Sequence, residues 1–183
     1  MSGTAERSRE GSKEMNVKKI YLDMDGVLAD FDRGVWDYCR LKAQPMNGKR
    51  SASLDDLMWE EIRKVDHFYD RLELMPGAKE MFDLIYGKYG EKCEILTGIP
   101  KPKRGIADAG PDKVRWVRRI LSDKIQVNVV QREEKLLFCG GANCILIDDR
   151  EKSIRKWKEQ DGTGILHISA EDTLEKLKEM GLL

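Results

Sequence analysis

The chain has 183 residues, of which 40% are hydrophobic, so it is long enough for one domain with a core and a small insert. Its 33 basic and 33 acidic residues give a formal net charge of +0, which provides no general attraction to nucleic acid or to an anionic membrane. No apolar stretch approaches the ~18 residues that a transmembrane helix needs, so the sequence indicates no membrane partner.

The N-terminal segment and the cysteines indicate the cellular compartment of the protein. Residues 1–16 are polar and rich in Gly and Ser, without the apolar core of a signal peptide, and we expect a disordered tail there. Neither His67 nor His167 completes a familiar zinc pattern with the cysteines. We therefore expect ordinary thiols in a reducing, cytoplasmic environment. The cysteines are Cys39, Cys93, Cys139 and Cys144.

The first predicted strand, residues 18–23, ends in two carboxylates one residue apart. Asp23 and Asp25 lie on the same face of an extended chain, and Gly26 follows directly. Two like charges held so close repel each other and shift their pKa values unless a cation lies between them. Because Mg²⁺ is a hard cation that takes oxygen ligands, this segment indicates acid, metal and phosphate chemistry.

Residues 31–75 follow this acidic segment and show helical patterning but no convincing strand. We expect them to form a small helical cap inserted into an α/β core domain, which residues 17–30 and 76–183 would form. The apolar positions that carry the helical pattern are Phe31, Val35, Tyr38, Leu54, Leu57, Met58 and Ile62.

Strands and helices alternate over the rest of the chain. Four further strands are predicted at residues 93–97, 125–130, 144–148 and 164–168. Helices are predicted at residues 78–89, at 111–121, after Asp149, and after the capping signal at 169–172. The second of these helices would turn Val114, Val117, Ile120 and Leu121 inward. Because most strands are continuously apolar, the predicted fold class is α/β, with a doubly wound parallel sheet.

Polar residues stand where several of these strands end, and ligands of an open parallel sheet bind beyond the carboxyl ends of its strands. Thr97 and Gly98 lie at the end of the second strand, and Lys135 follows the third. Asp148 and Asp149 end the fourth strand. Taken singly, the aspartates would most often cap a helix, and Thr97 would be an ordinary strand end. Their joint occurrence in this order favours one shared site.

This order of motifs resembles the four motifs of the haloacid dehalogenase superfamily of phosphotransferases. Residues 23–31, 74–78, 113–117 and 146–150 are together similar to the 5'(3')-deoxyribonucleotidases, and the resemblance spans roughly residues 18–160. It implies a Mg²⁺-dependent phosphatase that hydrolyses nucleoside (deoxyribonucleoside) monophosphates through an aspartyl-phosphate intermediate.

The resemblance also implies roles that general chemistry supports. Asp23 would attack phosphorus, and Asp25 would protonate the leaving oxygen and then deprotonate the attacking water. Thr97 would donate a hydrogen bond to a phosphoryl oxygen. Lys135 would be the catalytic lysine that offsets charge on the transferred group, with Lys113 as an auxiliary phosphate contact. For each lysine the alternative is a solvated position on the surface.

The metal ligands follow from the same resemblance. Mg²⁺ would be held by the Asp23 carboxylate, the Asp25 backbone carbonyl and Asp148, with Asp149 close by, directly or through water. Gly98 stands where the family often has Ser, so that only a backbone N–H remains to bind substrate there.

An aromatic group in the expected cap bears on substrate choice. Phe31 matches an aromatic residue that stacks on the nucleobase in the resembled family. Trp59, Phe68 and Tyr69 either join it or form the core of the cap itself. The insert is also shorter than in the best-known relatives, which leaves open another small phosphoester, such as a sugar phosphate, as substrate.

The order of the acidic residues along the chain distinguishes it from two other classes of protein. A phosphoacceptor receiver domain, which signals rather than turns over substrate, places its acidic pair early and its phosphorylated Asp about two strands later. Here Asp23 and Asp25 come first and Asp148 comes late, which disfavours that class. A dehalogenase would not need Asp25, because its reaction has no leaving oxygen to protonate. The base preference and the oligomeric state, including a homodimer, stay open.

Overall fold

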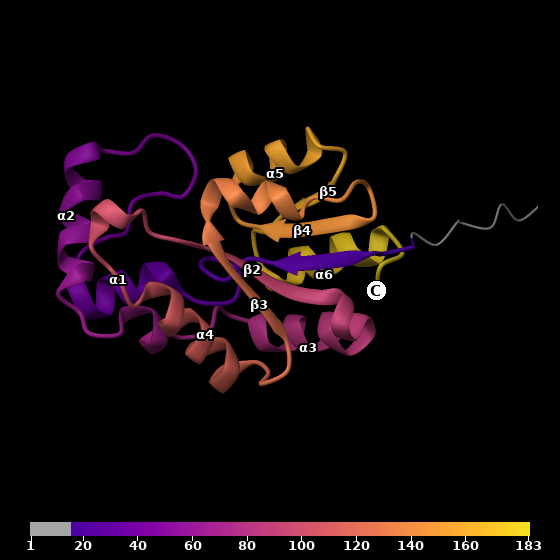
Figure 1. The fold of residues 1–183 in the computed structure, drawn as a ribbon, viewed down its shortest axis with the longest axis horizontal. Helices are drawn as coiled ribbons and strands as arrows, with labels where there is room; N and C mark the ends of the chain where they lie inside the picture. Colours follow the sequence, from indigo (N-terminus) through magenta and orange to yellow (C-terminus); the bar gives the residue numbers. More distant parts are fainter. Residues whose placement is uncertain (1–15) are drawn as a thin grey trace, which may run out of the picture.

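The computed structural model describes residues 16–183, so the expected tail lies, apart from residue 16, outside the described residues (Figure 1). A five-stranded sheet with the order β3-β2-β1-β4-β5 forms its centre, and every neighbouring pair of strands is parallel. The predicted doubly wound α/β fold is therefore confirmed. The strands are β1 (Lys19–Leu22), β2 (Cys93–Ile99), β3 (Gln126–Gln131), β4 (Cys144–Asp148) and β5 (Thr163–Leu166).

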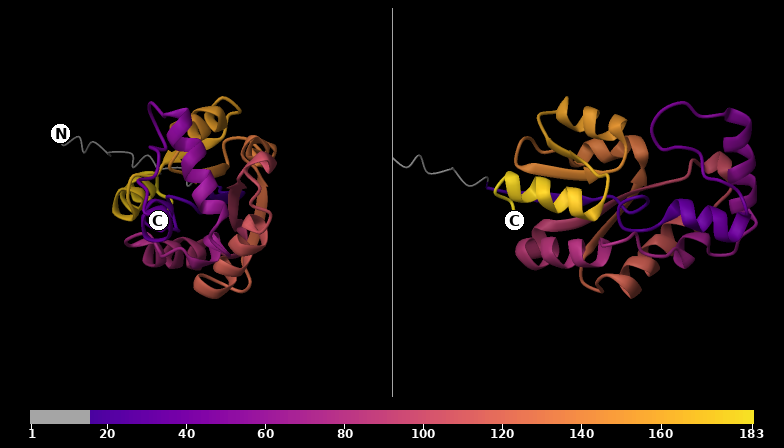
Figure 2. Two further views of the ribbon diagram at one scale, coloured as in Figure 1. Left: turned by 90° about the vertical axis from the view of Figure 1, so that its left-hand side faces the viewer. Right: turned by 180° about the vertical axis from the view of Figure 1, so that it is seen from behind.

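The sheet buries both of its faces, as its continuously apolar strands predict. In β1, Ile20 and Leu22 point to one face, whereas Tyr21 points to the other. The first face packs against α3 (Ala78–Tyr89), α4 (Ala109–Ile120) and α6 (Ala170–Glu179), which the view from behind in Figure 2 shows in part. The second face packs against α5 (Glu151–Lys158) and the 3₁₀ helix η4 (Arg132–Phe138).

Local signals explain where the helices begin and end. Gly77, at φ +71°, precedes α3, and Gly90, at φ +52°, follows it, because glycine adopts positive φ without steric cost. The Ser169 hydroxyl accepts a hydrogen bond from the Asp172 N–H at the start of α6, as the capping signal predicts. Pro111 lies inside the first turn of α4, where proline is tolerated, so this helix begins two residues before the prediction.

The buried face of α4 differs from the prediction. Val114, Ile120 and Leu121 are only partly buried, although Val117 is fully buried as expected. The side chains that α4 buries most deeply include Lys113 and Trp116. A hydrophobic pattern could not identify this face, because one of its central members is a lysine.

The segment after β1 forms helices at the carboxyl ends of the strands (Figure 1). These are α1 (Phe31–Cys39), α2 (Ala52–Arg63) and the 3₁₀ helix η1 (Phe68–Arg71); two further short 3₁₀ helices are η2 (Gly90–Lys92) and η3 (Pro102–Arg104). That residues 31–75 act as a separate cap stays a prediction. None of the helices in residues 16–183 has the length and apolar content that a membrane crossing requires.

Candidate active site

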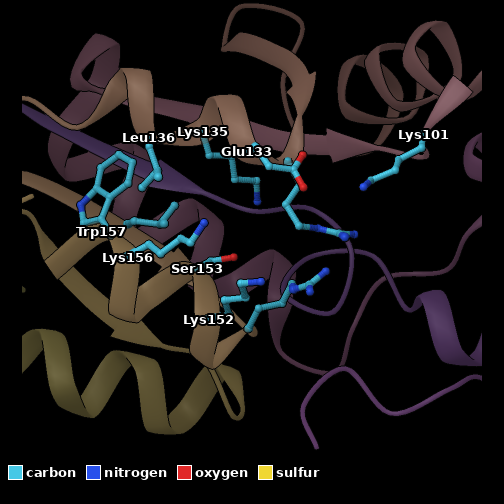
Figure 3. A pocket seen from close by; sticks show the side chains of 11 residues that line it. Lys101, Glu133, Lys135, Leu136, Lys152, Ser153, Lys156 and Trp157 are labelled. Carbon is cyan, nitrogen blue, oxygen red and sulfur yellow. The ribbon is translucent and has the colours of Figure 1, made fainter. Parts of the chain in front are cut away.

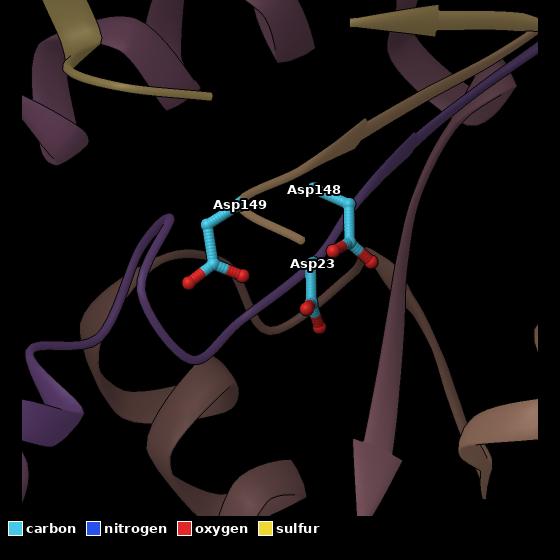
Figure 4. A group of neighbouring side chains, drawn as sticks. All are labelled: Asp23, Asp148 and Asp149. Carbon is cyan, nitrogen blue, oxygen red and sulfur yellow. The ribbon is translucent and has the colours of Figure 1, made fainter. Parts of the chain in front are cut away.

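Three carboxylates meet at the carboxyl ends of β1 and β4 (Figure 4). Asp23 directly follows β1, Asp148 ends β4, and Asp149 comes next in the chain. Each offers an oxygen atom that lies within 4.8 Å of those of the other two. The order of the sheet explains this meeting. The chain winds outward in opposite directions from β1 and β4, and such a reversal opens a crevice between the two strands.

Lys135 joins two of these carboxylates. Its Nζ atom lies 2.9 Å from Oδ1 of Asp23 and 2.8 Å from Oδ2 of Asp148, and only 4% of the residue is exposed. Burial alone would lower the pKa of Lys135, but the two carboxylates raise it above its usual value. The alternative of a solvated lysine is therefore wrong for this residue.

Lys113 reaches the site from α4. It is fully buried, and its Nζ atom donates to Oδ2 of Asp25 at 2.6 Å, to Oγ1 of Thr97 at 3.0 Å and to the Gly98 carbonyl at 2.8 Å. The same atom lies 4.6 Å from the centre of the Tyr69 ring, within the range of a cation–π interaction. A solvated position on the surface is therefore wrong for Lys113 too. This lysine binds Asp25, the second carboxylate of the pair Asp23 and Asp25.

The two carboxyl groups of this acid pair have opposite pKa shifts. Burial would raise the pKa of Asp23, but Lys135 and Lys113 lower it below its usual value. Burial raises the pKa of Asp25, and the nearby Lys113 offsets only part of that effect. Such a pair provides one ionised carboxylate and one carboxyl group that can carry a proton.

The acidic cluster fits a hard divalent cation. Burial, followed by the charges of Asp23 and Asp148, raises the pKa of Asp149 to about 8. Its Oδ1 atom is buried and has no hydrogen-bond partner among the described residues. Carboxylate oxygens are the ligands that hard divalent cations such as Mg²⁺ take, so these three residues could hold one. The Asp25 side chain points to Lys113 instead, so a ligand role for its backbone carbonyl stays a prediction.

Gly26 is required where β1 turns away from this cluster. Its φ of +79° lies in the left-handed region, where a side chain is strained. A Cβ atom at this position would also overlap the carboxylate of Asp149. The glycine of the first motif therefore makes room for the third carboxylate of the cluster.

A cavity of about 260 Å³ lies beside Asp25, with walls from residues 31–75 and from the ends of β2 and β3. Phe31, Trp59 and Gly98 are among its lining residues. Phe31 is only 8% exposed, because its ring stacks on Tyr69 at 6.2 Å between centroids and packs edge-on against Phe68 at 5.7 Å. The aromatic residues of this segment pack on one another, as one sequence interpretation expects, and Phe31, Trp59 and Tyr69 also line the cavity, as the other requires. A substrate contact by Phe31 or Gly98 stays a prediction.

Three residues near the site were missed by sequence reasoning. The Asn47 side chain donates to the Asp149 carbonyl at 2.8 Å and accepts from the Glu151 N–H at 3.0 Å. Arg132 and Arg150 line the cavity beside Asp25. Arg132 directly follows the polar end of β3, and Arg150 directly follows the pair of aspartates at the end of β4. These positions are a sequence signal that could have identified both arginines. Asn47 lies in a loop without any periodic pattern, so its sequence offers no such signal.

Comparisons with known proteins agree with this geometry. No protein-family model matches the chain. Its sequence is 27% identical over 171 residues to the mitochondrial 5'(3')-deoxyribonucleotidase of Mus musculus, covering 80% of this chain and 69% of that protein.

Solved structures with a similar fold include a HAD family hydrolase from Deinococcus radiodurans, which holds phosphate and sodium. It has a TM-score of 0.51 and 11% identity, with 92% of this chain and 98% of that chain covered. A protein assigned as a phosphoglycolate phosphatase from Lactobacillus plantarum has a TM-score of 0.50 and 14% identity, with 90% and 99% covered. The resemblance drawn from the motifs is thus confirmed: the chain has the fold of the haloacid dehalogenase superfamily, and its sequence is similar to that of a 5'(3')-deoxyribonucleotidase.

Proposed function

We propose that this chain is a phosphoric monoester hydrolase that removes phosphate from deoxyribonucleoside monophosphates, with Mg²⁺ and through a phosphorylated Asp23. The phosphatase class has the support of the similar proteins, and the substrate follows from the deoxyribonucleotidase likeness. One observation carries the proposal: Asp23 is bound to Lys135 and faces two further carboxylates, while Asp25, two residues on, is bound to Lys113.

Asp23 is the nucleophile in this proposal. Its lowered pKa keeps the carboxylate ionised at neutral pH, so one oxygen can attack phosphorus. Lys135 holds the carboxylate in place through a contact of 2.9 Å. The same ammonium group offsets negative charge as the phosphoryl group is transferred.

Asp25 is the general acid and base. Its raised pKa suits a carboxyl group that gives a proton to the leaving oxygen and later takes one from water. Lys113 donates to the Thr97 oxygen at 3.0 Å, so the Thr97 hydroxyl directs its own hydrogen elsewhere and can donate it to a phosphoryl oxygen.

Mg²⁺ would be held by the carboxylates of Asp23, Asp148 and Asp149 and by the Asp25 carbonyl. Once bound, the cation supplies positive charge that stabilises the oxygens of the transferred phosphate. Without it, the three carboxylates repel one another, and this repulsion adds to the effect of burial in raising the pKa of Asp149.

Turnover by an Asp23→Asn variant tests this proposal. We expect the variant to fold, with an unchanged circular dichroism spectrum, and to lose at least about 10³-fold in kcat on deoxyribonucleoside monophosphates, because an amide is a poor nucleophile. Trapping of a phosphorylated intermediate on wild-type protein, but not on the variant, gives a second readout. Near-normal activity of the variant would contradict the covalent mechanism.

A second candidate is a phosphatase for another small phosphoester, such as a sugar phosphate. The packing of Phe31 against Tyr69 and Phe68 favours it, because a ring held in this way has little free surface for a base. Rates on a matched panel of nucleotides and sugar phosphates separate the two candidates. The receiver alternative is wrong on topology, since receivers have the order 2-1-3-4-5 and this sheet has β3-β2-β1-β4-β5.

A further inference from the structure

A second cavity lies next to the acidic cluster and is not used in the mechanism above. It measures about 200 Å³ and lies between η4 and α5. Figure 3 shows Lys101 reaching toward it from one side, Lys135 from η4, and Lys152 and Lys156 from α5. Lys101, Arg132, Glu133 and Arg150 line this cavity and also the cavity beside Asp25, so the two spaces adjoin.

The second cavity is strongly basic although the chain as a whole is neutral. Glu133 is the one acidic residue in its lining. Five basic lining residues form no ion pair with any other described residue. They are Lys101, Arg132, Arg150, Lys152 and Lys156. Like charges gathered without counter-charges repel each other, so this arrangement is suited to a bound anion.

Two further observations point to a ligand there. The Nε atom of Arg150 is buried and has no partner among the described residues, and an unmade hydrogen bond of this kind costs stability unless a ligand accepts it. Leu136, Leu146 and Trp157 form an apolar part of the wall. An apolar wall lowers the local dielectric constant and strengthens the attraction between an anion and the basic side chains.

The basic cavity lies next to the proposed nucleophile. Lys135 belongs to its lining, and the Nζ atom of this lysine lies 2.9 Å from Asp23. Because the two cavities share four lining residues, a small molecule with one phosphate at Asp23 can extend a second anionic group into the basic cavity. Arginine and lysine side chains together are typical of sites that bind phosphate.

We propose that this cavity binds a second phosphate group of the substrate, so that the preferred substrate is a small bisphosphate rather than a monophosphate. The inference rests on the phosphatase chemistry proposed above, in which Asp23 receives the first phosphate, and it replaces the monophosphate substrate by a bisphosphate. A free phosphate ion has the same chemistry as the second group, and the experiment below distinguishes these two sources.

The test compares wild-type protein with a Lys152→Gln/Lys156→Gln double variant and a matched control, Lys158→Gln. Lys158 is exposed on the same helix and is not part of the cavity lining. The probes are deoxythymidine 5'-monophosphate and deoxythymidine 3',5'-bisphosphate, with fructose 6-phosphate and fructose 1,6-bisphosphate as a second pair. For at least one pair we expect wild-type kcat/KM to favour the bisphosphate by ~10-fold or more, and the double variant to lose that preference. The Lys158→Gln protein keeps it.

Binding to the Asp23→Asn protein separates failure of this inference from failure of the proposed function. Calorimetry on that protein should show tighter binding of the bisphosphate than of the monophosphate, with the difference removed by Lys152→Gln/Lys156→Gln, even if neither ester is hydrolysed. Equal affinity for both members of each pair, or a preference unchanged by the double variant, overturns the inference.

A competition experiment with inorganic phosphate distinguishes a substrate phosphate from a free phosphate ion in the basic cavity. If the cavity serves the substrate, free phosphate competes with the bisphosphate and does not add to it. If phosphate instead binds the Asp23→Asn protein together with the bisphosphate, and the double variant weakens that binding, the cavity holds a free ion and the substrate proposal is overturned.

Discussion

Lys113 is the residue whose position most constrains the site. A fully buried ammonium group is tolerated only when its charge and its donors are satisfied, and here Asp25, Thr97 and Gly98 satisfy them. Two of these contacts position the Asp25 and Thr97 side chains, which the proposed mechanism needs for proton transfer and phosphate binding. One lysine would therefore serve both the fold and the proposed mechanism.

Replacement of this lysine by methionine should damage catalysis more than it damages the fold. Lys113→Met keeps the length of the side chain but leaves Asp25 without its counter-charge, and we expect kcat/KM to fall by about 10² to 10³-fold. Steady-state kinetics on the substrate found by the panel measures this. Lys124→Met, at an exposed position, is the control, and an equal loss in both variants would contradict a role for Lys113 in the site.

At the scale of elements, α4 connects the cap segment to the sheet. The Trp116 ring is buried, and its Nε1 atom donates to the Leu72 carbonyl at 2.7 Å. Asp112, in the first turn of α4, contacts Arg115 and lies 2.9 Å from Nδ1 of His67. These contacts fix the helix that carries Lys113 between the two parts of the chain.

Loss of the indole contact should therefore weaken the whole fold. Trp116→Phe removes the N–H partner of a buried carbonyl and leaves space in the core, so we expect the free energy of unfolding to fall by about 2 to 3 kcal/mol. Urea denaturation measures the change. Trp36→Phe, at a position that is 57% exposed, should change it by less than about 0.5 kcal/mol. Similar effects in both variants would argue against this account of α4.

The elements themselves were largely predictable, because apolar runs and capping residues act locally. The exception at the end of β5 has a physical cause: the strand ends at Leu166, and the apolar Ile168 beyond it is exposed, so hydrophobicity alone misplaces the boundary. The inward face of α4 was misjudged for a different reason. Lys113 is held inside by partners from distant segments, which no local pattern contains.

At the scale of the whole molecule, the meeting of the three carboxylates depends on β1 and β4 being parallel neighbours, and the sequence predicted their parallel direction but not the strand order. Asp23 and Asp148 could be placed together in advance because parallel strands end at one edge. Asn47 could not be predicted, since its contact with Asp149 joins a loop to a strand end about a hundred residues away in the chain. Nor does the sequence pattern show that Arg150 is left with a buried, unpartnered Nε atom.

A bound cation should stabilise the whole molecule in a pH-dependent way. Because the pKa of Asp149 is raised from 3.8 to about 8, the folded protein binds more protons than the unfolded chain between these values. Stability contributed by the protonated group is therefore lost as pH rises through that window. Mg²⁺ binds the ionised carboxylate and replaces the proton, so its affinity should increase from pH 6.5 to pH 8.5.

Calorimetric melting with MgCl₂ or with a chelator measures this effect. At 100 times its Kd, Mg²⁺ should add about 2.7 kcal/mol, which corresponds to a rise in Tm of about 5 to 10 °C for a chain of this length. At one fixed MgCl₂ concentration we expect the rise to be larger at pH 8.5 than at pH 6.5, and to shrink in Asp149→Asn. A rise that does not depend on pH, or that survives in this variant unchanged, would contradict the proposed metal site.

The paired contacts of Asn47 have a mechanical consequence. One amide group fastens the loop between α1 and α2 to the carbonyl of Asp149 and to the N–H of Glu151, at either side of a single short stretch of backbone. Any displacement of that loop would break both bonds at once and release the stretch of backbone that carries Asp149. In the proposed metal site, the position of this loop would thereby be coupled to that of a metal ligand through one uncharged side chain.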